Sequence, residues 1–282
     1  MTHEITSCLW FDGKAHEAAA FYQSIFSDFT PISENPFAVN YRMGGRRFMH
    51  LNGGPGYPIN SSVSFFMNLE DEDEIHRVWE KLSNGGQILM PLNTYPWSPQ
   101  YGWCADRYGV NWQLMKNHES RTAVLPALMF CQGNNGKAEE ALKFYTSLFP
   151  NSSIVNISRY EKGEPDVEGN IKYAQFELNQ LPFTAMDSSM PHAFTFSEGV
   201  SFTVAVDTQE EIDFYWTSLI GTQGSPGKCG WLKDAYGLSW QVVPTCLATF
   251  MSNPATAPKA TYAFLQMTKF DIAALEKACL AD

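Results

Sequence analysis

Residues 102–113 read Gly-Trp-Cys-Ala-Asp-Arg-Tyr-Gly-Val-Asn-Trp-Gln, and residues 230–241 read Gly-Trp-Leu-Lys-Asp-Ala-Tyr-Gly-Leu-Ser-Trp-Gln. Seven of the twelve positions are identical, at an offset of 128 residues. A self-match this rich in tryptophan indicates an internal duplication, and a duplication fixes the architecture before any single element is assigned.

Two further blocks recur in the same order. Residues 13–26 share Gly-Lys-Ala, Phe-Tyr and a final Phe with residues 136–149, and residues 63–82 share Val-Ser-Phe, Ile, Trp and Leu with residues 200–219. The chain is therefore a tandem repeat of a unit of about 120 residues, with its junction near Asn117–Val124. We expect one domain over residues 1–120, a second over 121–248, and a linker with a terminal helix over 249–282.

Composition narrows the class of protein. A chain of 282 residues with 44% hydrophobic residues can form two domains with real cores. The net charge of −11 disfavours nucleic acid, whose phosphates select basic surfaces. The apolar runs are too short for a membrane span, and the first residues lack the pattern of a signal peptide. The six cysteines include no Cys-x-x-Cys pair, as is typical of free thiols in a reducing compartment. We predict a cytoplasmic protein that binds neither nucleic acid nor membranes.

Apolar periodicity predicts the elements. In repeat one it indicates strands over 5–11, 37–43, 46–51, 62–69, 103–105 and 110–115, and helices over 14–26 and 71–82. Repeat two shows the same series between 125 and 243, and residues 261–280 then read as a terminal helix. Repeat one has a longer loop, Met90–Tyr101, with three prolines and the aromatic residues Tyr95, Trp97 and Tyr101. A stiff aromatic loop suits a lid or pocket wall, and packing against the partner domain is the alternative.

These residues resemble a known family. A strand, Asp-Gly-Lys-Ala at residues 12–15, a helix ending in Phe-Tyr-x-x-x-Phe, and Gly-Trp-x-x-Asp-x-Tyr-Gly-x-x-Trp-Gln are similar to the PhnB-like branch of the vicinal oxygen chelate superfamily. Proteins of this branch often carry the description 3-demethylubiquinone-9 3-methyltransferase. No glycine-rich loop of the kind that binds S-adenosylmethionine follows a first strand here, so the sequence does not support methyl transfer.

The resemblance implies an α+β fold of four βαβββ modules, each curling a sheet around a cup. Two modules make one glyoxalase/bleomycin-resistance-like domain, and such domains commonly dimerise. We expect the two domains of this chain to pack as an intramolecular pseudo-dimer, either as a monomer or as a weak homodimer.

Metal-dependent members of the superfamily place His, Gln or Glu ligands on the first and last strand of each module. Aligned here, these positions fall on Ser7, His50, Ser64 and Gln113 in repeat one and on Pro126, Ala185, Ser201 and Gln241 in repeat two. None is a carboxylate, and one His with one Gln is fewer than the three protein ligands of a typical catalytic site. We predict no bound metal and no cofactor. Asp187 shares a strand face with Ala185 and could supply a missing donor.

The candidate ligand-binding residues are His50, Asn52, Trp97, Tyr101, Gln113, Asp187 and Gln241. His50 is either a polar group in the cup that acts as acid or base, or a hydrogen-bonded core histidine. Gln113 and Gln241 each follow a tryptophan, which favours an inward amide in contact with a ligand. Asp106 and Asp234 precede tight turns, where a carboxylate bonds its own backbone.

Three functions remain open. The sequence favours a protein that binds a small, partly apolar metabolite in a metal-free cup. The alternatives are a metal-dependent enzyme of glyoxalase or dioxygenase type and a purely structural duplication whose cups are filled by side chains. The unmatched polar and aromatic residues of repeat one predict that its site is the stronger of the two.

Overall fold

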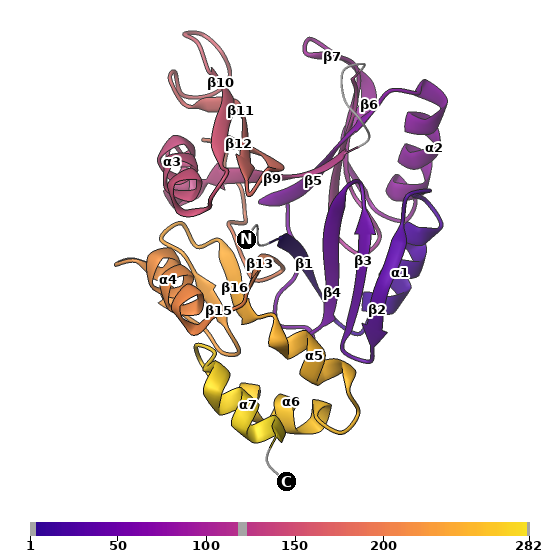
Figure 1. Cartoon of the computed structure of the whole chain (residues 1–282). Coiled ribbons are helices and arrows are strands. Elements are labelled where there is room, and N and C mark those ends of the chain that lie inside the picture. The colour runs from indigo at the N-terminus through magenta and orange to yellow at the C-terminus, as the bar shows by residue number, and fades with distance from the viewer. Residues whose placement is uncertain (1–3, 118–122, 281–282) are drawn as a thin grey trace. The chain divides into compact units, whose positions relative to one another are not determined.

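The computed structural model describes residues 4–117 and 123–280; residues 118–122 of the expected junction and the residues at both ends lie outside it. The chain folds into two compact parts, one of residues 7–200 and one of residues 1–6 with 201–282. Figure 1 shows the strands and helices coloured in the order in which they follow along the chain.

Each module is one βαβββ unit. The first holds β1 (Ile5–Phe11), α1 (Ala15–Gln23), β2 (Thr30–Asn35), β3 (Ala38–Met43) and β4 (Arg46–Asn52). The second holds β5 (Val63–Leu69), α2 (Glu72–Ser83), β6 (Gln87–Tyr95), β7 (Ser98–Ala105) and β8 (Asn111–Lys116). The third holds β9 (Ala123–Cys131), the short 3₁₀ turn η1 (Gln132–Asn134), α3 (Ala138–Leu148), β10 (Ser153–Arg159), β11 (Ile171–Leu178) and β12 (Leu181–Ser188).

The fourth module lies in the second part of the chain. It holds β13 (Val200–Val206), α4 (Gln209–Ile220), β14 (Ser225–Pro226), β15 (Trp231–Lys233) and β16 (Ser239–Pro244). Three helices follow: α5 (Cys246–Ser252), α6 (Ala257–Leu265) and α7 (Ile272–Leu280). The α+β class and the four modules are therefore confirmed.

One sheet joins the two repeats. Its eight strands follow the order β10-β11-β12-β9-β5-β8-β7-β6, so the second module of repeat one continues into the first module of repeat two. The joint is the antiparallel pair β5–β9, in register from Val63 opposite Leu128 to Asn68 opposite Ala123. The first and last strands of each module are parallel neighbours, as in β5–β8 and β9–β12. We call this sheet the joint sheet.

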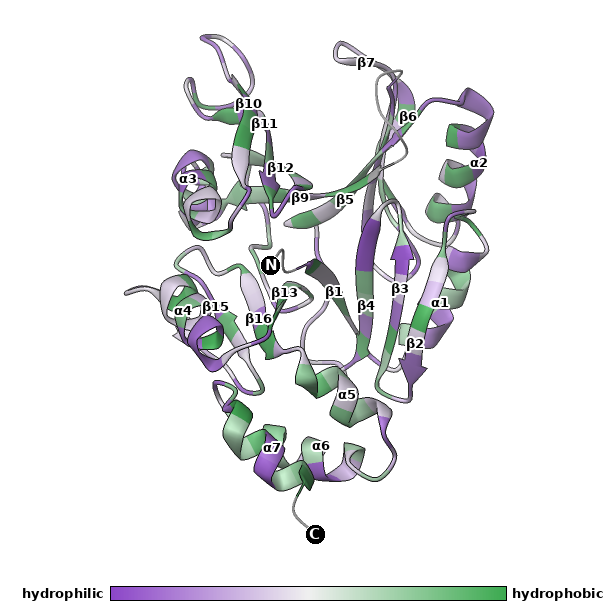
Figure 2. Ribbon diagram, viewed as in Figure 1, coloured by the Kyte–Doolittle hydropathy of each residue, from purple (hydrophilic) through white to green (hydrophobic). Residues whose placement is uncertain are grey.

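Local sequence explains the helices that cover it. Asp71 caps α2 by accepting a hydrogen bond from the Glu74 amide at 2.8 Å, which satisfies a backbone donor at the helix start. The apolar side of α2 is buried, as its spacing predicts, with Ile75, Val78, Trp79 and Leu82 on it. Figure 2 shows the hydrophobic colour on one side of α2 and along β9.

The turn between β3 and β4 is formed by Gly44 and Gly45, and both glycines have positive φ, at 59° and 72°. A side chain at Gly44 would meet Val124 at 2.2 Å, so this turn also needs a glycine for close approach to β9. The Val124 amide donates to the Gly44 carbonyl at 3.0 Å. The first module thus contacts the joint sheet through its hairpin.

Three expectations for the elements were wrong. Residues 90–101 form no loop: they belong to the hairpin β6–β7, which turns at Pro96 and Trp97. β6 is an edge strand with several register shifts, which is where Pro91, having no N–H, can be accommodated.

Strand β2 was not predicted, because all of its residues are exposed and show no apolar alternation. The single terminal helix expected over 261–280 is two helices, α6 and α7, with a break at 266–271.

Candidate functional site

The two faces of the joint sheet differ in what covers them. A side chain at Gly102 on β7 would meet the Trp79 ring of α2 at 2.7 Å, so Gly102 faces the helix. Side chains alternate along a strand, so Tyr101 and Trp103 point to the opposite face. We call the face opposite α2 the inner face. Strand register then assigns to it Ser64, Phe66, Asn68, Gln113, Met115, Leu125, Ala127, Met129, Thr184 and Met186.

A directional chain of hydrogen bonds lies at the centre of this face. The Tyr101 hydroxyl donates to Gln113 Oε1 at 2.5 Å, and Gln113 Nε2 donates to Ser64 Oγ at 2.7 Å. All three residues are buried. Within the described ranges, Ser64 has no acceptor for its own hydroxyl hydrogen. The Ser64 hydroxyl hydrogen is therefore the unused donor at the end of this hydrogen-bond chain.

The side chains around this hydrogen-bond chain are apolar, and several of them are flexible. Phe66, Tyr101, Leu125 and Ala127 form a buried cluster, against which the half-buried residues Met90, Tyr95, Trp103 and Met115 pack. Met129 and Met186 on the inner face add further thioethers. Methionine side chains are flexible and polarisable, which suits a surface that adjusts to the shape of a ligand.

Two more polar groups of the inner face are buried without a hydrogen-bond partner among residues 4–117 and 123–280. They are Thr184 Oγ1 and Asn68 Oδ1, and their residues are 0% and 9% exposed. Thr184 lies opposite Ala127, which in turn lies opposite Ser64, so the two hydroxyl groups belong to one row across three strands. A buried polar group without a partner is costly, and a ligand is one way to satisfy it.

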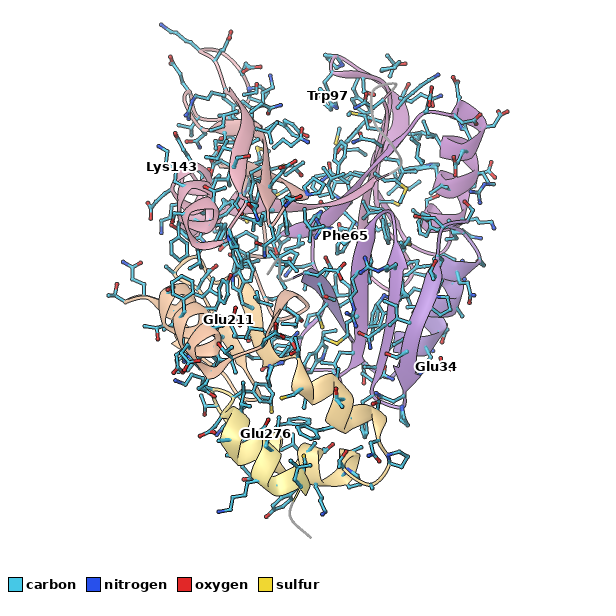
Figure 3. The ribbon with its side chains drawn as sticks, in the orientation of Figure 1. Glu34, Phe65, Trp97, Lys143, Glu211 and Glu276 are labelled. Carbon is cyan, nitrogen blue, oxygen red and sulfur yellow. The ribbon has the colours of Figure 1, made fainter. Side chains whose placement is uncertain are left out.

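Trp97 lies at the tip of the β6–β7 hairpin, where Figure 3 labels it at the end of the strands. Its side chain is 57% exposed. It stacks on Tyr95 with ring centroids 5.1 Å apart and meets Tyr101 edge-on at 5.7 Å. Tyr101 therefore connects the exposed aromatic tip to the buried hydrogen-bond chain.

Repeat two carries an equivalent but incomplete chain. Gln241 Nε2 donates to Ser201 Oγ at 3.0 Å, matching Gln113 and Ser64. The position of Tyr101 is taken by Cys229, which supplies no phenol. The amide–serine pair is thus a property of both repeats, whereas the tyrosine donor belongs to repeat one.

His50 lies on the helix-covered side of its strand. Its Nε2 is 2.6 Å from the Tyr41 hydroxyl, and its Nδ1 is 3.1 Å from the Ala15 carbonyl of α1. Complete burial lowers its pKa to about 3, so the ring stays neutral. Of the two interpretations given to His50, these contacts support the hydrogen-bonded core histidine.

Asn52 and Asp187 cap helices in equivalent places. Asn52 Oδ1 accepts from the Ala15 amide at 2.9 Å, and Asp187 Oδ1 accepts from the Ala138 amide at 3.1 Å. Asp187 also binds the amides of Gly136 and Ile171. Burial raises the pKa of the Asp187 carboxyl. Both side chains use their oxygens within the fold: Asn52 on β4, outside the joint sheet, and Asp187 on the face of the joint sheet opposite Ser64.

The structure therefore brings together Tyr101 and Gln113 and places Trp97 beside Tyr101. Asp187 lies on the opposite face of the joint sheet, whereas His50 and Asn52 lie on β4, which is not a strand of that sheet. Gln241 belongs to the second part of the chain. Sequence reasoning missed Thr184, Asn68 and Trp103 as inner-face residues. Strand alternation from Gln113 could have found Met115, but Thr184 required the pairing of β12 with β9.

The turn role expected for Asp106 is confirmed, since its Oδ1 accepts from the Tyr108 amide at 2.8 Å.

A model of a known protein family matches this protein twice, once in each repeat. The family model described as 3-demethylubiquinone-9 3-methyltransferase matches residues 3–115 and, a second time, residues 122–243. The chain belongs to this family. Its two copies in one polypeptide confirm the tandem duplication. No match was found among curated proteins.

Solved structures of similar proteins fall into two groups. A PhnB protein from Bacillus cereus is 42% identical and matches 42% of this chain and 96% of its own, with a TM-score of 0.39. Protein PA1353 from Pseudomonas aeruginosa is 24% identical over 40% of this chain and 97% of its own, with a TM-score of 0.37. Glyoxalase I from Zea mays matches 86% of this chain and 92% of its own at 11% identity and a TM-score of 0.58, a likeness of fold alone.

The inner face does not fit the metal that other members of the superfamily bind. Its central donors are the hydroxyls of Ser64 and Thr184 and the amide of Gln113, whose oxygen and nitrogen already bond Tyr101 and Ser64. Within the part of the chain that the structure describes, no three His, Cys, Asp or Glu side chains are grouped to hold an ion.

A pocket in the second part of the chain is formed by other residues, none of which belongs to the joint sheet. It measures about 690 Å³, and its lining residues lie around the starts of α4 and α7: Asp207, Thr208, Gln209, Asp213, Lys269, Phe270, Asp271, Ile272, Ala273 and Glu276. Its carboxylates are largely engaged: Asp213 pairs with Lys269, and Asp271 accepts from the Ala274 amide at 2.9 Å. The inner face, with donors left over, is the better candidate. Among the described residues, no helix has the length and apolarity that crossing a membrane requires.

Proposed function

We propose that this protein binds a small, partly apolar molecule on the inner face of the joint sheet, without a metal. The observation that carries the proposal is the buried Tyr101–Gln113–Ser64 chain, which ends in a free donor inside an apolar setting. Ligand sites of small molecules combine mostly apolar walls with a few placed polar groups, and this arrangement has that composition.

The side-chain groups of Tyr101, Gln113 and Ser64 favour ligand binding over acid–base catalysis. They are a phenol, an amide and an aliphatic hydroxyl, none of which exchanges a proton readily near neutral pH. Burial raises the pKa of the Tyr101 phenol still further. A general acid or base would need a pKa near the working pH.

Tryptophan fluorescence tests the proposal with 2-acetylnaphthalene as probe. Trp103 lies half-buried on the inner face, and Trp231 is its equivalent in repeat two. We expect one strong site per chain and about fivefold weaker binding in Trp103→Ala, because a lost aromatic contact is worth on the order of 1 kcal/mol. Trp231→Ala is the matched control. Absence of binding, or the same loss in both variants, would refute the proposal.

Elemental analysis tests the metal-free part of the proposal separately. We expect less than about one tenth of an equivalent of nickel, zinc, iron or manganese per purified chain, because the inner face offers fewer than three strong ligands. Native mass spectrometry of the same sample would show any small molecule that co-purifies. A full equivalent of one metal that survives dialysis would count against it.

A further inference from the structure

The direction of the Tyr101–Gln113–Ser64 chain specifies the polar atom of the ligand. Ser64 Oγ accepts from Gln113, so its own hydrogen is left to donate. The group that meets Ser64 must then be an acceptor, such as a carbonyl oxygen. This inference rests on the proposed function, since it concerns the ligand of the same face.

Tyr101 fixes the direction of the chain. A carboxamide can be placed in two orientations, which exchange its oxygen and nitrogen. With the oxygen toward Tyr101, the buried phenol has an acceptor at 2.5 Å; in the reverse orientation its hydrogen would face an N–H donor. A phenol is a better donor and a poorer acceptor than the aliphatic hydroxyl of Ser64, so the observed orientation is the favoured one. Hydrogen bonds in such a chain also polarise one another and strengthen the terminal donor.

The ligand is also expected to be uncharged. The three linked residues are neutral, and neither of the hydrogen bonds between them involves a charged group. The whole polypeptide carries a net charge of −11. A carboxylate buried beside Ser64 would lack a countercharge, which is costly in an apolar setting. The nearby rings of Phe66 and Trp103 favour a flat apolar body.

We infer that the inner face selects uncharged ketones, aldehydes or similar carbonyl compounds on a flat apolar body, and that Tyr101 is the positioning residue that orients Gln113 and Ser64 toward the carbonyl oxygen.

The test compares two probes of nearly the same shape. They are 2-acetylnaphthalene and 2-isopropenylnaphthalene, in which a CH₂ group replaces the carbonyl oxygen. The measured quantity is the ratio of their dissociation constants, which cancels the contribution of the shared ring. We expect Ser64→Ala to reduce the preference for the ketone about tenfold, the usual worth of one buried hydrogen bond.

Tyr101→Phe separates orientation from contact. It leaves the ring and Ser64 in place and removes only the phenolic oxygen, so a smaller fall in the same ratio, about threefold, is expected, with little change for the isopropenyl probe. Ser201→Ala, the equivalent change in repeat two, is the matched control and should leave the ratio unaltered. Tyr101→Phe also serves if Ser64→Ala fails to fold.

The outcomes separate this inference from the proposed function. If neither probe binds the unaltered protein, the proposed function and this inference both fail. If both probes bind but the ratio is the same in Ser64→Ala and Tyr101→Phe as in the unaltered protein, the face binds ligands and the assignment of a carbonyl acceptor is wrong. A fall in the ratio in Ser201→Ala as large as in Ser64→Ala would likewise overturn it.

Discussion

The role of each polar residue in this protein depends on the face of its strand to which the side chain points. Phe48 and His50 share a face of β4, and the His50 ring binds α1 rather than a cup. The sequence alignment placed His50 at a ligand position, but His50 and Asn52 of β4 both bond Ala15 of α1, on a strand outside the joint sheet. A shift of one residue along a strand reverses the face. Gln113 and Ser64, aligned by the same procedure, do lie on the inner face.

The buried His50 predicts a dependence of stability on pH. Its pKa is about 3 in the folded protein and near 6.5 when unfolded, so between these values only the unfolded chain takes up the proton. Its contribution to stability is complete above pH 6.5 and is lost as pH falls toward 3. From pH 7.5 to 5.5 this lowers the free energy of unfolding by about 1.4 kcal/mol. Urea unfolding at pH 7.5 and at pH 5.5 should show this fall in the free energy of unfolding in the unaltered protein and not in His50→Gln. An equal fall in both proteins would contradict the prediction.

The helix cap formed by Asn52 predicts a second effect. Asn52→Ala should lower the free energy of unfolding by about 1 kcal/mol, because the Ala15 amide at the start of α1 loses its acceptor. Asn52→Asp restores an acceptor, as Asp187 provides in repeat two, and should stay within about 0.5 kcal/mol of the unaltered protein. Chemical denaturation of the three proteins measures both values. Weaker probe binding in Asn52→Ala at unchanged stability would instead point to a ligand role.

Among the elements, the β6–β7 hairpin separates the two repeats most clearly. Repeat two has the two-residue strand β14 and the three-residue strand β15 where repeat one has strands of nine and eight residues. The longer hairpin carries Tyr95 and Trp97 beyond the buried cluster that contains Tyr101. An aromatic extension at the margin of an apolar face is well placed to cover a bound ring.

Removal of the exposed indole tests the hairpin. Trp97→Ala should cost less than about 1 kcal/mol of stability, since one aromatic stack on a surface is lost. It should weaken binding of 2-acetylnaphthalene several-fold, because the ring that extends the apolar face is gone. Phe37→Ala removes another exposed aromatic, 65% exposed in the turn before β3, and should leave binding unchanged. Thermal melts with fluorescence titration would measure both, and equal affinities in the two variants would exclude a role for the hairpin.

On the scale of the whole molecule, the two repeats are continuous through the joint sheet. Strands β5 and β9 pair over six residues each, and Arg46 of β4 donates to the Val124 and Pro182 carbonyls at 3.2 and 2.6 Å. The Arg46 guanidinium also lies 4.5 Å from the centre of the Phe183 ring. These contacts cross the boundary between the repeats, so one repeat supplies partners that the other needs.

Separation of the repeats should therefore fail. Residues 1–120 and 121–282 expressed apart would expose β5 and β9 as unpaired edges with apolar side chains, which favours association or aggregation. We expect each half alone to be unstable or oligomeric, and the two mixed halves to form a one-to-one complex. Size-exclusion chromatography with light scattering would decide. Two stable monomers that do not associate would show that the joint sheet is dispensable.

The sequence by itself determined the duplication, the order of elements within each module and the family, because a repeated block with two tryptophans and paired glycines leaves few alternatives. It also indicated Gln113 as inward-facing, since an amide between apolar neighbours on a strand must find a partner. It missed β2 and β6, whose exposed or proline-containing strands lack alternation, and it read α6 and α7 as one helix.

The tertiary structure decided the faces and the neighbours. Whether His50 or Gln113 meets a ligand depends on strand register, and side chains alternate with a period of two, so a local pattern cannot fix it without the pairing partner. Thr184 and Ser64 are 120 positions apart in the sequence and share a row only because β9 pairs with both β5 and β12. Such a row exists only once the strands of two repeats are hydrogen-bonded side by side, which is a property of the folded sheet and of no shorter segment.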